Sequence, residues 1–314
     1  MEDTNMSKVP VWFDCDTGVD DAAAIILANY LEEIDLLGIS TLSGNVTVDK
    51  TTINTIKVCD LMGKKYPVYP GAAKPWIKPY ESASLFHGED GLGGAVLPDP
   101  SYEPEKEAAW DALYRIAKEQ NGELQVVAVG PMTNLAIALS KYPELTKLIK
   151  RILIMGGAAV GGNCTSCAEF NIYTDPHAAQ AVFRSGIQVV MCGLDVTLKA
   201  FFTEAEVEEV GAHNTPVTKF FRDSTQRALH ACLGFGLPGI SMHDSCPLLY
   251  IAHPEIFVAQ EAGVYVETQS ELTLGKTVTD LFSDHKFEKK NAVVVLDIDR
   301  EAMFKIMKEA LYSY

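Results

Sequence analysis

Four aspartates stand within eight positions near the start of the chain, in the stretch DCDTGVDD at residues 14–21. They follow VPVWF, a run of apolar and β-prone residues that predicts a buried strand. Carboxylates this close repel one another and raise one another's pKa, so something must offset the cost. Asp20 and Asp21 could simply begin a helix and complement its dipole. Four acids at one strand exit instead favour a bound divalent cation, and all-oxygen ligands favour Ca²⁺ or Mg²⁺ over Zn²⁺.

Two familiar motifs come close to this stretch but do not match it. An EF-hand loop is excluded because position 18 is glycine and Ile25 stands where the closing glutamate would be. A strand that ends in D-x-D is also the nucleophile signature of Mg²⁺-dependent phosphatases of the haloacid dehalogenase type. That signature needs Thr or Val where Gly18 stands, and here two further acids follow. The phosphatase is therefore the weaker alternative.

The composition limits the class of protein. Of 314 residues, 47% are hydrophobic and 22% are charged, which is enough apolar material for a substantial core. The formal net charge of −16 argues against nucleic acid and against an anionic membrane surface as partners. No apolar run is long enough to span a bilayer, and the opening MEDTNMSKVP lacks the pattern of a secretion signal. Seven irregularly spaced cysteines indicate reduced thiols. We therefore expect a soluble, cytoplasmic protein.

Short β-branched runs alternate with helical stretches along the chain. Strands are predicted at residues 9–13, 34–42, 123–130, 151–157 and 187–193, and helices at 20–33, 51–65, 107–121, 133–143, 175–186 and 203–213. The tail predicts a hairpin from residues 262–269 and 271–281, then a strand at 291–298 and a helix at 299–314. This alternation implies an α/β fold with a parallel central sheet and helices on both faces. No linker or repeat interrupts it, so we expect one domain over residues 1–314.

Polar segments follow several of these strands. DCDTGVDD comes after the first strand and SGN (43–45) after the second, while GPMTN (130–134) and MGG (155–157) follow two later ones. In open parallel sheets, sites form outside the carboxyl ends of the strands. We therefore expect one active site at this edge. The long Gly- and Pro-rich stretch 75–105 is read as a loop that covers the site or forms an interface.

Four further motifs join DCDTGVDD to make a recognisable set. They are STLSGNVTV (40–48), LFHGEDGLGG (85–94), MGGAAVGGNCTSCAEFNIYTDPHAA (155–179) and SMHDSC (241–246). Together they resemble the nucleoside hydrolases, the inosine–uridine-preferring N-ribohydrolases, from about residue 9 to the end of the chain. The resemblance implies a Rossmann-like, mostly parallel sheet and a tightly held Ca²⁺. It also implies hydrolysis of the N-glycosidic bond of ribonucleosides to ribose and free base, with a nucleoside as the small-molecule partner.

The resemblance also implies roles for individual residues. Asp16 is similar to the general base that also touches the metal, and the implied metal ligands are Asp16, Asp21, the carbonyl of Val129, and Asp244. His243 is similar to a histidine that in the family helps to protonate the departing base. The implied substrate contacts are Asp20 and Asn171 at the ribose 2′-hydroxyl, Asn163 and Glu169 at the 5′-hydroxyl with Met155 nearby, Asn45 at the sugar, and His87 facing the base. Asp14 is assigned to orientation or turn support.

This set of residue types suits the chemistry. Breaking an N-riboside passes through a transition state with oxocarbenium character. A water must be held on one face of C1′ and lose a proton, which a cation and a carboxylate achieve together. A site that grips each hydroxyl with carboxylates and amides should reject deoxyribose. A catalytically silent nucleoside- or ribose-binding protein is the alternative of another class, although every required carboxylate is present.

The chain departs from the family before its HD motif. Residues 221–241 should carry aromatic side chains, often tyrosines, against the leaving base, but they offer Phe235 and His230 and no tyrosine. Base preference therefore stays open. Cys164 and Cys167 form a C-x-x-C without the second pair that a zinc site needs, so they are interpreted as small packing residues. The family commonly forms homodimers or homotetramers, and one of these is expected here.

Overall fold

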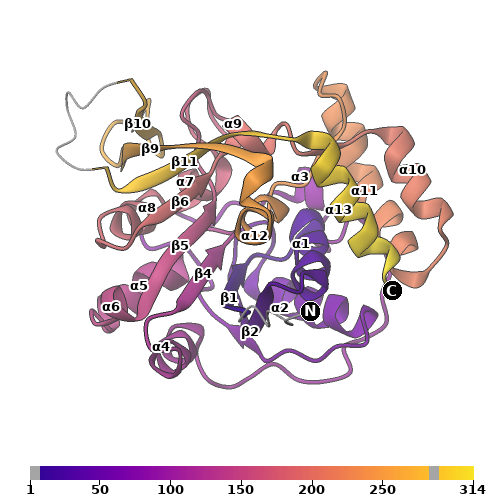
Figure 1. The fold of residues 1–314 in the computed structure, drawn as a ribbon, viewed down its shortest axis with the longest axis horizontal. Helices are drawn as coiled ribbons and strands as arrows, with labels where there is room; N and C mark the ends of the chain where they lie inside the picture. Colours follow the sequence, from indigo (N-terminus) through magenta and orange to yellow (C-terminus); the bar gives the residue numbers. More distant parts are fainter. Residues whose placement is uncertain (1–7, 283–289) are drawn as a thin grey trace, which may run out of the picture.

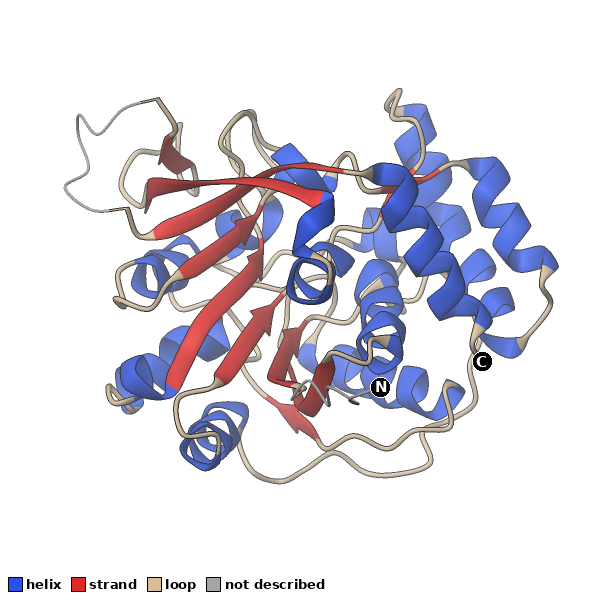
Figure 2. Cartoon of the chain, viewed as in Figure 1, coloured by secondary structure: helices blue, strands red, loops and turns tan. Residues whose placement is uncertain are grey.

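The structure is a computed structural model that describes residues 8–282 and 290–314. Residues 1–7, which carry most of the prediction about a secretion signal, lie outside the described residues. A nine-stranded sheet crosses the molecule in the order β10-β9-β11-β6-β5-β4-β1-β2-β3 (Figures 1 and 2). Its neighbouring strands are parallel, except that β9 runs antiparallel to β10 and β11. The strands are β1 (Val9–Cys15), β2 (Ile34–Thr41), β3 (Val68–Pro70), β4 (Leu124–Ala128), β5 (Ile149–Met155), β6 (Val189–Cys192), β9 (Phe257–Val266), β10 (Thr277–Asp280) and β11 (Ala292–Ile298).

Helices cover both faces of this sheet. Buried side chains form two clusters, and β1 supplies Val11 and Phe13 to one and Trp12 to the other, as alternation along a strand requires. Helices α1, α2, α12 and α13 pack into the first cluster, and α4, α5 and α8 into the second. A short pair, β7 (Phe201–Phe202) and β8 (Ile240–Ser241), forms a separate two-stranded sheet. The helices are α1 (Val19–Tyr30), α2 (Val48–Leu61), α3 (Ser84–His87), α4 (Ala109–Glu119), α5 (Thr133–Lys141), α6 (Leu145–Leu148), α7 (Phe170–Thr174), α8 (Pro176–Phe183), α9 (Leu194–Thr197), α10 (Glu204–Ala212), α11 (Pro216–Gly234), α12 (Ser245–Ala252), the 3₁₀ turn η1 (Pro254–Ile256) and α13 (Arg300–Tyr312).

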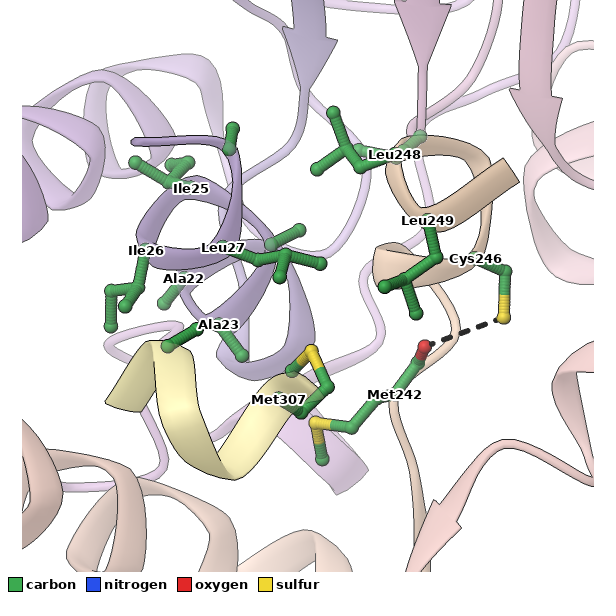
Figure 3. Packing of buried hydrophobic residues seen from close by; sticks show 14 of the residues in the cluster. Ala22, Ala23, Ile25, Ile26, Leu27, Met242, Cys246, Leu248, Leu249 and Met307 are labelled. Atoms are coloured by element: carbon green, nitrogen blue, oxygen red, sulfur yellow. Dashed lines mark hydrogen bonds between the residues drawn. The ribbon is translucent and has the colours of Figure 1, made fainter. Parts of the chain in front are cut away.

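The packing of α1 places the carboxylates. Ala22 and Ala23 lie beside α13, whose Met307 points toward them, and Leu248 and Leu249 reach toward α1 from α12 (Figure 3). Small alanines let the helices approach closely, and apolar burial of this kind stabilises the contact. The aspartates 20 and 21 occupy the first turn of α1, and Asp244 stands directly before α12. Helix packing therefore brings together acids that lie more than 220 residues apart in the sequence.

The predicted fold class is confirmed, and so are the strands and helices named from the sequence, with shifted ends. The tail hairpin forms between β9 and β10. However, β9 begins at Phe257, five residues before the predicted start; residues 258–261 (VAQE) are exposed and lack the continuous apolar pattern by which the strand was recognised. Helix α11 was not recognised within residues 221–241. Among the described residues, no helix is both long and apolar enough to cross a membrane.

Candidate active site

A cavity of about 370 Å³ opens where the parallel strands end. Asp20 after β1, Asn45 after β2, Val129 after β4 and Met155 at the end of β5 all line it. Four strand exits therefore meet at one place, which is the expected location of a site in this type of sheet. The wall also contains six other residues named from the sequence, which are His87, Asn163, Glu169, Asn171, His243 and Asp244.

Asp16 and Asp21 are not on the wall of the cavity but are fully buried next to it. Asp21 holds the turn before α1 in place, because its carboxylate accepts hydrogen bonds from the N–H groups of Asp16 (3.2 Å) and Gly18 (2.9 Å). The Asn45 side chain donates to Asp21 as well, at 3.1 Å. This turn fixes the start of α1, where a carboxylate also complements the helix dipole.

Asp16 is held on one side only. Its Oδ2 accepts a hydrogen bond from the N–H of Asn45 at 2.7 Å, whereas Oδ1 is buried and has no hydrogen-bond partner. Glycines crowd both oxygens: a Cβ on Gly44 would lie 2.1 Å from Oδ2, and one on Gly130 would lie 2.7 Å from Oδ1. A buried carboxylate oxygen without a partner is costly, so its place in the site calls for an explanation.

Three carboxylates converge beside Asp16. Oxygens of Asp20, Asp21 and Asp244 lie within 4.8 Å of one another. Burial, followed by the charge of Asp21, raises the pKa of Asp20 to about 7. Burial, and then the charges of Asp20, Asp21 and Asp16, raise the pKa of Asp244 well above its usual range. Without a countercharge the cluster is therefore driven toward protonation.

The donor set fits a hard divalent cation. The ligand atoms available are carboxylate oxygens, one of them the partnerless oxygen of Asp16. None of the described residues that line the cavity is Lys or Arg, so no side-chain cation on the wall offsets the charge. The geometry groups Asp20 with Asp21 and Asp244 most closely, and the division of roles between Asp16 and Asp20 remains a prediction. The Val129 carbonyl accepts the Asn171 amide at 2.7 Å, which leaves it a second lone pair.

Asn171 and Glu169 form a further part of the cavity wall. The Asn171 Nδ2 group donates to the carbonyls of Val129 (2.7 Å) and Met155 (3.1 Å), so its Oδ1 is the atom free to accept. Glu169 caps α7 and accepts from the N–H groups of Asn171, Ile172 and Gly157. Its burial raises its pKa to about 7, against the opposing effect of these three donors.

Two histidines complete the polar lining. His87 Nδ1 accepts the N–H of Val19 at 3.1 Å, so a neutral His87 carries its proton on Nε2. His243 Nδ1 lies 2.7 Å from the hydroxyl of Thr197, which leaves Nε2 for a ligand. Burial lowers the pKa of both rings to about 4. Both are therefore neutral at neutral pH.

The loop predicted to cover the site does line it. Residues 81–83 and 85–87 belong to the cavity wall, and they are tied down by the Ala83 N–H to the Asn45 carbonyl and by Arg227 Nε to the Leu85 carbonyl, both at 3.0 Å. Asp14, by contrast, lies outside the cavity. It accepts from Ser40 and from Asn134, the latter at 2.7 Å, which fits its predicted supporting role.

The wall that should face the leaving base differs from expectation. His230 is exposed and Phe235 is 67% exposed, and neither lines the cavity. Helix α11 instead presents Ala228 and Cys232, one turn apart. Sequence reasoning missed them because a small apolar pair at helical spacing looks like ordinary core. It also missed Thr197, although this residue follows the exit of β6, where the strand-end rule would have found it.

One interpretation of the cysteines is wrong. Cys164 is exposed and lines the cavity, so it is not a buried packing residue. Cys167 is half-buried. The turn that carries them is a polar, Gly-rich segment, which cannot form a core of its own.

The fold and the pocket together define an α/β enzyme with a carboxylate-lined cavity. The family model for inosine-uridine preferring nucleoside hydrolases matches residues 11–305. A pyrimidine-specific ribonucleoside hydrolase, RihA, from Citrobacter koseri is 42% identical over 98% of this chain and 99% of its own length. The solved structure of a purine-preferring ribonucleoside hydrolase from Gardnerella vaginalis has a TM-score of 0.91 at 32% identity, covering 96% of this chain and 98% of that one. A plant nucleoside hydrolase, PpNRh1, also has a TM-score of 0.91, at 28% identity over 98% of this chain and all of that one.

The chain belongs to the inosine–uridine preferring nucleoside hydrolase family. It is a ribonucleoside hydrolase, which confirms the family and the enzyme class predicted from the sequence.

Proposed function

We propose that this enzyme hydrolyses pyrimidine ribonucleosides to ribose and free base, with Ca²⁺ as its cofactor and Asp16 as its general base. The observation that carries the proposal is the partnerless, buried Oδ1 of Asp16 beside the cluster of Asp20, Asp21 and Asp244. Asp16, Asp21, Asp244 and the Val129 carbonyl would hold the cation. When bound, the cation supplies positive charge that acidifies a neighbouring water and attracts the vicinal hydroxyls of ribose.

Asp16 is built to take one proton at one atom. The Asn45 N–H occupies its Oδ2, so Oδ1 is the oxygen that accepts the proton of the attacking water. Burial and the charge of Asp21 raise the pKa of Asp16 in the metal-free protein, and the positive charge of a bound cation would lower it again, so that the carboxylate is ionised and can accept a proton. The glycines at 44 and 130 crowd it and fix its orientation.

The polar walls hold the sugar. Asn171 presents Oδ1 as an acceptor because its nitrogen is committed to two carbonyls, and Asp20 faces the same cavity. These two groups would take the 2′-hydroxyl. Asn163 and Glu169, near Met155, would take the 5′-hydroxyl. Losing a hydroxyl would leave such buried polar groups unpaired, so a 2′-deoxynucleoside should be a poor substrate.

The histidines act on the departing base as neutral rings. With Nδ1 of His87 occupied by the Val19 N–H, its Nε2–H is a donor. A hydroxyl of Thr197 that donates to Nδ1 of His243 makes Nε2 of this ring a donor as well. Both then stabilise negative charge on the base as the bond breaks.

The choice of pyrimidines is supported by the relatives named as pyrimidine-specific at 42% and 39% identity, from Citrobacter koseri and Shewanella woodyi. We also propose that the enzyme works in nucleoside salvage in the cytoplasm, as a homodimer or homotetramer of single-domain chains. The family resemblance supports this part, and light scattering of the purified protein tests the oligomeric state.

The decisive experiment measures ribose release from uridine, cytidine, inosine, adenosine and 2′-deoxyuridine. It compares native enzyme, chelator-stripped enzyme reloaded with Ca²⁺ or Mg²⁺, and Asp16→Asn, with Asp14→Asn as the matched control. Release from pyrimidine ribosides that is lost on stripping, restored best by Ca²⁺, and absent only in Asp16→Asn supports the proposal. Equal turnover of inosine, full activity after stripping, or an active Asp16→Asn would each overturn the corresponding part. A folded, calcium-loaded protein that cleaves no nucleoside would return us to a silent binding protein.

A further inference from the structure

Two of the seven cysteines, Cys164 and Cys167, are accessible to solvent, whereas the other five are buried. All seven are free thiols, and Cys15, Cys59, Cys192, Cys232 and Cys246 are buried. Cys164 is exposed and belongs to the cavity wall, and Cys167 is half-buried. They stand three positions apart in the loop between β5 and α7. The reaction proposed above uses neither of them.

The loop folds back on itself and places both cysteines in one short turn. The N–H groups of Asn163, Cys164 and Thr165 all point to the carbonyl of Ala168, at 3.1–3.2 Å. The hydroxyl of Thr165 accepts from the N–H groups of Cys167 (3.3 Å) and Ala168 (3.0 Å). Residues 164 and 167 thus span a closed turn, the arrangement in which a four-residue C-x-x-C segment can form an internal disulfide.

This turn is part of the substrate pocket. Asn163 precedes Cys164 directly, and its Oδ1 accepts the N–H of Phe170 at 3.0 Å, at the start of α7. Glu169 comes two residues after Cys167 and caps the same helix. Cys167 Sγ lies 3.6 Å from the carbonyl of Leu272, a contact with the segment between β9 and β10. A bond between the two sulfurs would pull on both ends of the segment that carries Asn163 and Glu169.

We propose that Cys164 and Cys167 form a reversible disulfide when a small-molecule disulfide such as oxidised glutathione is present, and that this bond weakens binding of the substrate's 5′-hydroxymethyl end. The proposed contact of Asn163 and Glu169 with the 5′-hydroxyl is the part that rests on the proposed function. The disulfide itself does not depend on it.

Formation of the Cys164–Cys167 disulfide needs no oxidant other than the small-molecule disulfide. The Cys164 thiolate attacks one sulfur of the small disulfide, forms a mixed disulfide and expels one thiolate. The Cys167 thiolate then attacks Cys164 Sγ and expels the second thiolate. The two thiol protons pass to the two departing thiolates, so two cysteines are oxidised and one disulfide is reduced. Cys164 reacts first because it is the exposed member of the pair.

The surroundings of Cys164 determine the pH at which the exchange reaction runs well. Burial raises the pKa of the Cys164 thiol, and nearby Lys78 opposes this effect while Glu169 and Glu81 add to it. Exchange starts from the thiolate, so the reaction is slow at neutral pH and is best run near pH 8. Cys232, the other thiol on the cavity wall, has no cysteine at C-x-x-C spacing.

The test uses calcium-loaded full-length enzyme treated with oxidised glutathione, alongside Cys164→Ser and Cys167→Ser. Trypsin cuts after Arg151 and Arg184, and no other Lys or Arg lies between them, so both thiols fall in one peptide that contains no other cysteine. Mass spectrometry of this peptide reads the bond directly. Each protein's KM and kcat for uridine and for 5′-deoxyuridine are compared with those of its own reduced form.

We expect the wild-type peptide to lose two hydrogens and the KM for uridine to rise about three- to tenfold, the size of one lost hydrogen bond. The KM for 5′-deoxyuridine and kcat should change little, and dithiothreitol should reverse the effect. Cys167→Ser should stop at the mixed disulfide. A peptide that keeps both thiols overturns the inference, and so does a disulfide that leaves the KM for uridine unchanged. If reduced enzyme releases no ribose at all, the proposed function fails while the peptide mass still decides whether the bond forms.

Discussion

Asp244→Asn should make the metal-free protein more stable and the metal-loaded protein less so. Carboxylate oxygens of Asp20, Asp21 and Asp244 lie within 4.8 Å of one another. At an effective dielectric constant of about 20, two full charges at that separation repel by about 3 kcal/mol. Partial protonation relieves some of this, so replacing one carboxylate with an amide of the same shape should stabilise stripped protein by about 1–3 kcal/mol. The new amide can also donate to the two remaining acids.

The assay is thermal or urea unfolding of chelator-stripped protein, with and without Ca²⁺. In stripped protein, the variant should unfold at a temperature higher by a few degrees, since about 1 kcal/mol shifts Tm by about 2–4 °C in proteins approaching this size. With Ca²⁺ at about 100 times its Kd, the free energy of unfolding of the wild type should rise by about 2.7 kcal/mol. Ca²⁺ should stabilise Asp244→Asn much less, because this variant lacks one of the carboxylates that would bind the cation. Asp14→Asn, a buried carboxylate outside the cluster, is the matched control and should keep the full gain.

The difference in stability between chelator-stripped wild type and chelator-stripped Asp244→Asn should depend on pH. Burial and Asp21 raise the pKa of Asp20 to about 7, whereas an unfolded aspartate titrates near 4. Between these values the folded protein holds a proton that the unfolded chain has released, so stripped wild type loses stability as pH rises from about 4 to about 7. Asp244→Asn should lose less over that range. A stripped variant less stable than stripped wild type, or one with an undiminished Ca²⁺ gain, would refute the reasoning.

Three shorter predictions concern catalysis and packing. Asp16→Asn should lower kcat for uridine by about 10²–10⁴-fold even at saturating Ca²⁺ and uridine, because the base acts in the transition state; a loss confined to KM would contradict this. His243→Ala should slow uridine cleavage by about 10–100-fold but leave a nitrophenyl riboside nearly unaffected, since that leaving group departs without a donor; equal losses on both would argue for a structural role. Gly18→Ala should reduce activity and cost about 1–3 kcal/mol, because the new Cβ would lie 2.3 Å from His87 Nδ1. Gly234→Ala, where nothing lies within 4 Å, is its control in unfolding measurements.

Local patterns were enough to predict the sheet and the position of the pocket. DCDTGVDD and SGN each follow a short apolar run that predicts a buried strand, and strand ends of a parallel sheet share one edge. The placement of Asp20, Asn45 and Val129 around one cavity follows from that rule. Asp244 lies more than 220 residues from Asp21, and its position was implied by the resemblance and not by any local pattern.

Contacts between distant segments could not be predicted in this way. His243 depends on Thr197, 46 residues away, and Asp14 depends on Asn134, 120 residues away, through single hydrogen bonds that leave no periodic trace. The wall of α11 was missed for a different reason. Ala228 and Cys232 are small and apolar, so nothing in their types separates a pocket lining from a helix core. Base preference depends on such residues, which explains why it stayed open.

Asp16 shows how the fold prepares the site before any ligand arrives. A carboxylate in water would be solvated on both oxygens, but here glycine backbone packs against both of them and the Asn45 N–H binds Oδ2. Side chains at positions 44 and 130 would collide with it, so glycine at these two strand exits is required by the acid and not by a turn. Since Oδ1 then has no internal partner, the folded protein carries an unpaired buried acceptor. At Asp16 this cost has a use, because an acceptor that is already in place spares the reacting complex that reorganisation.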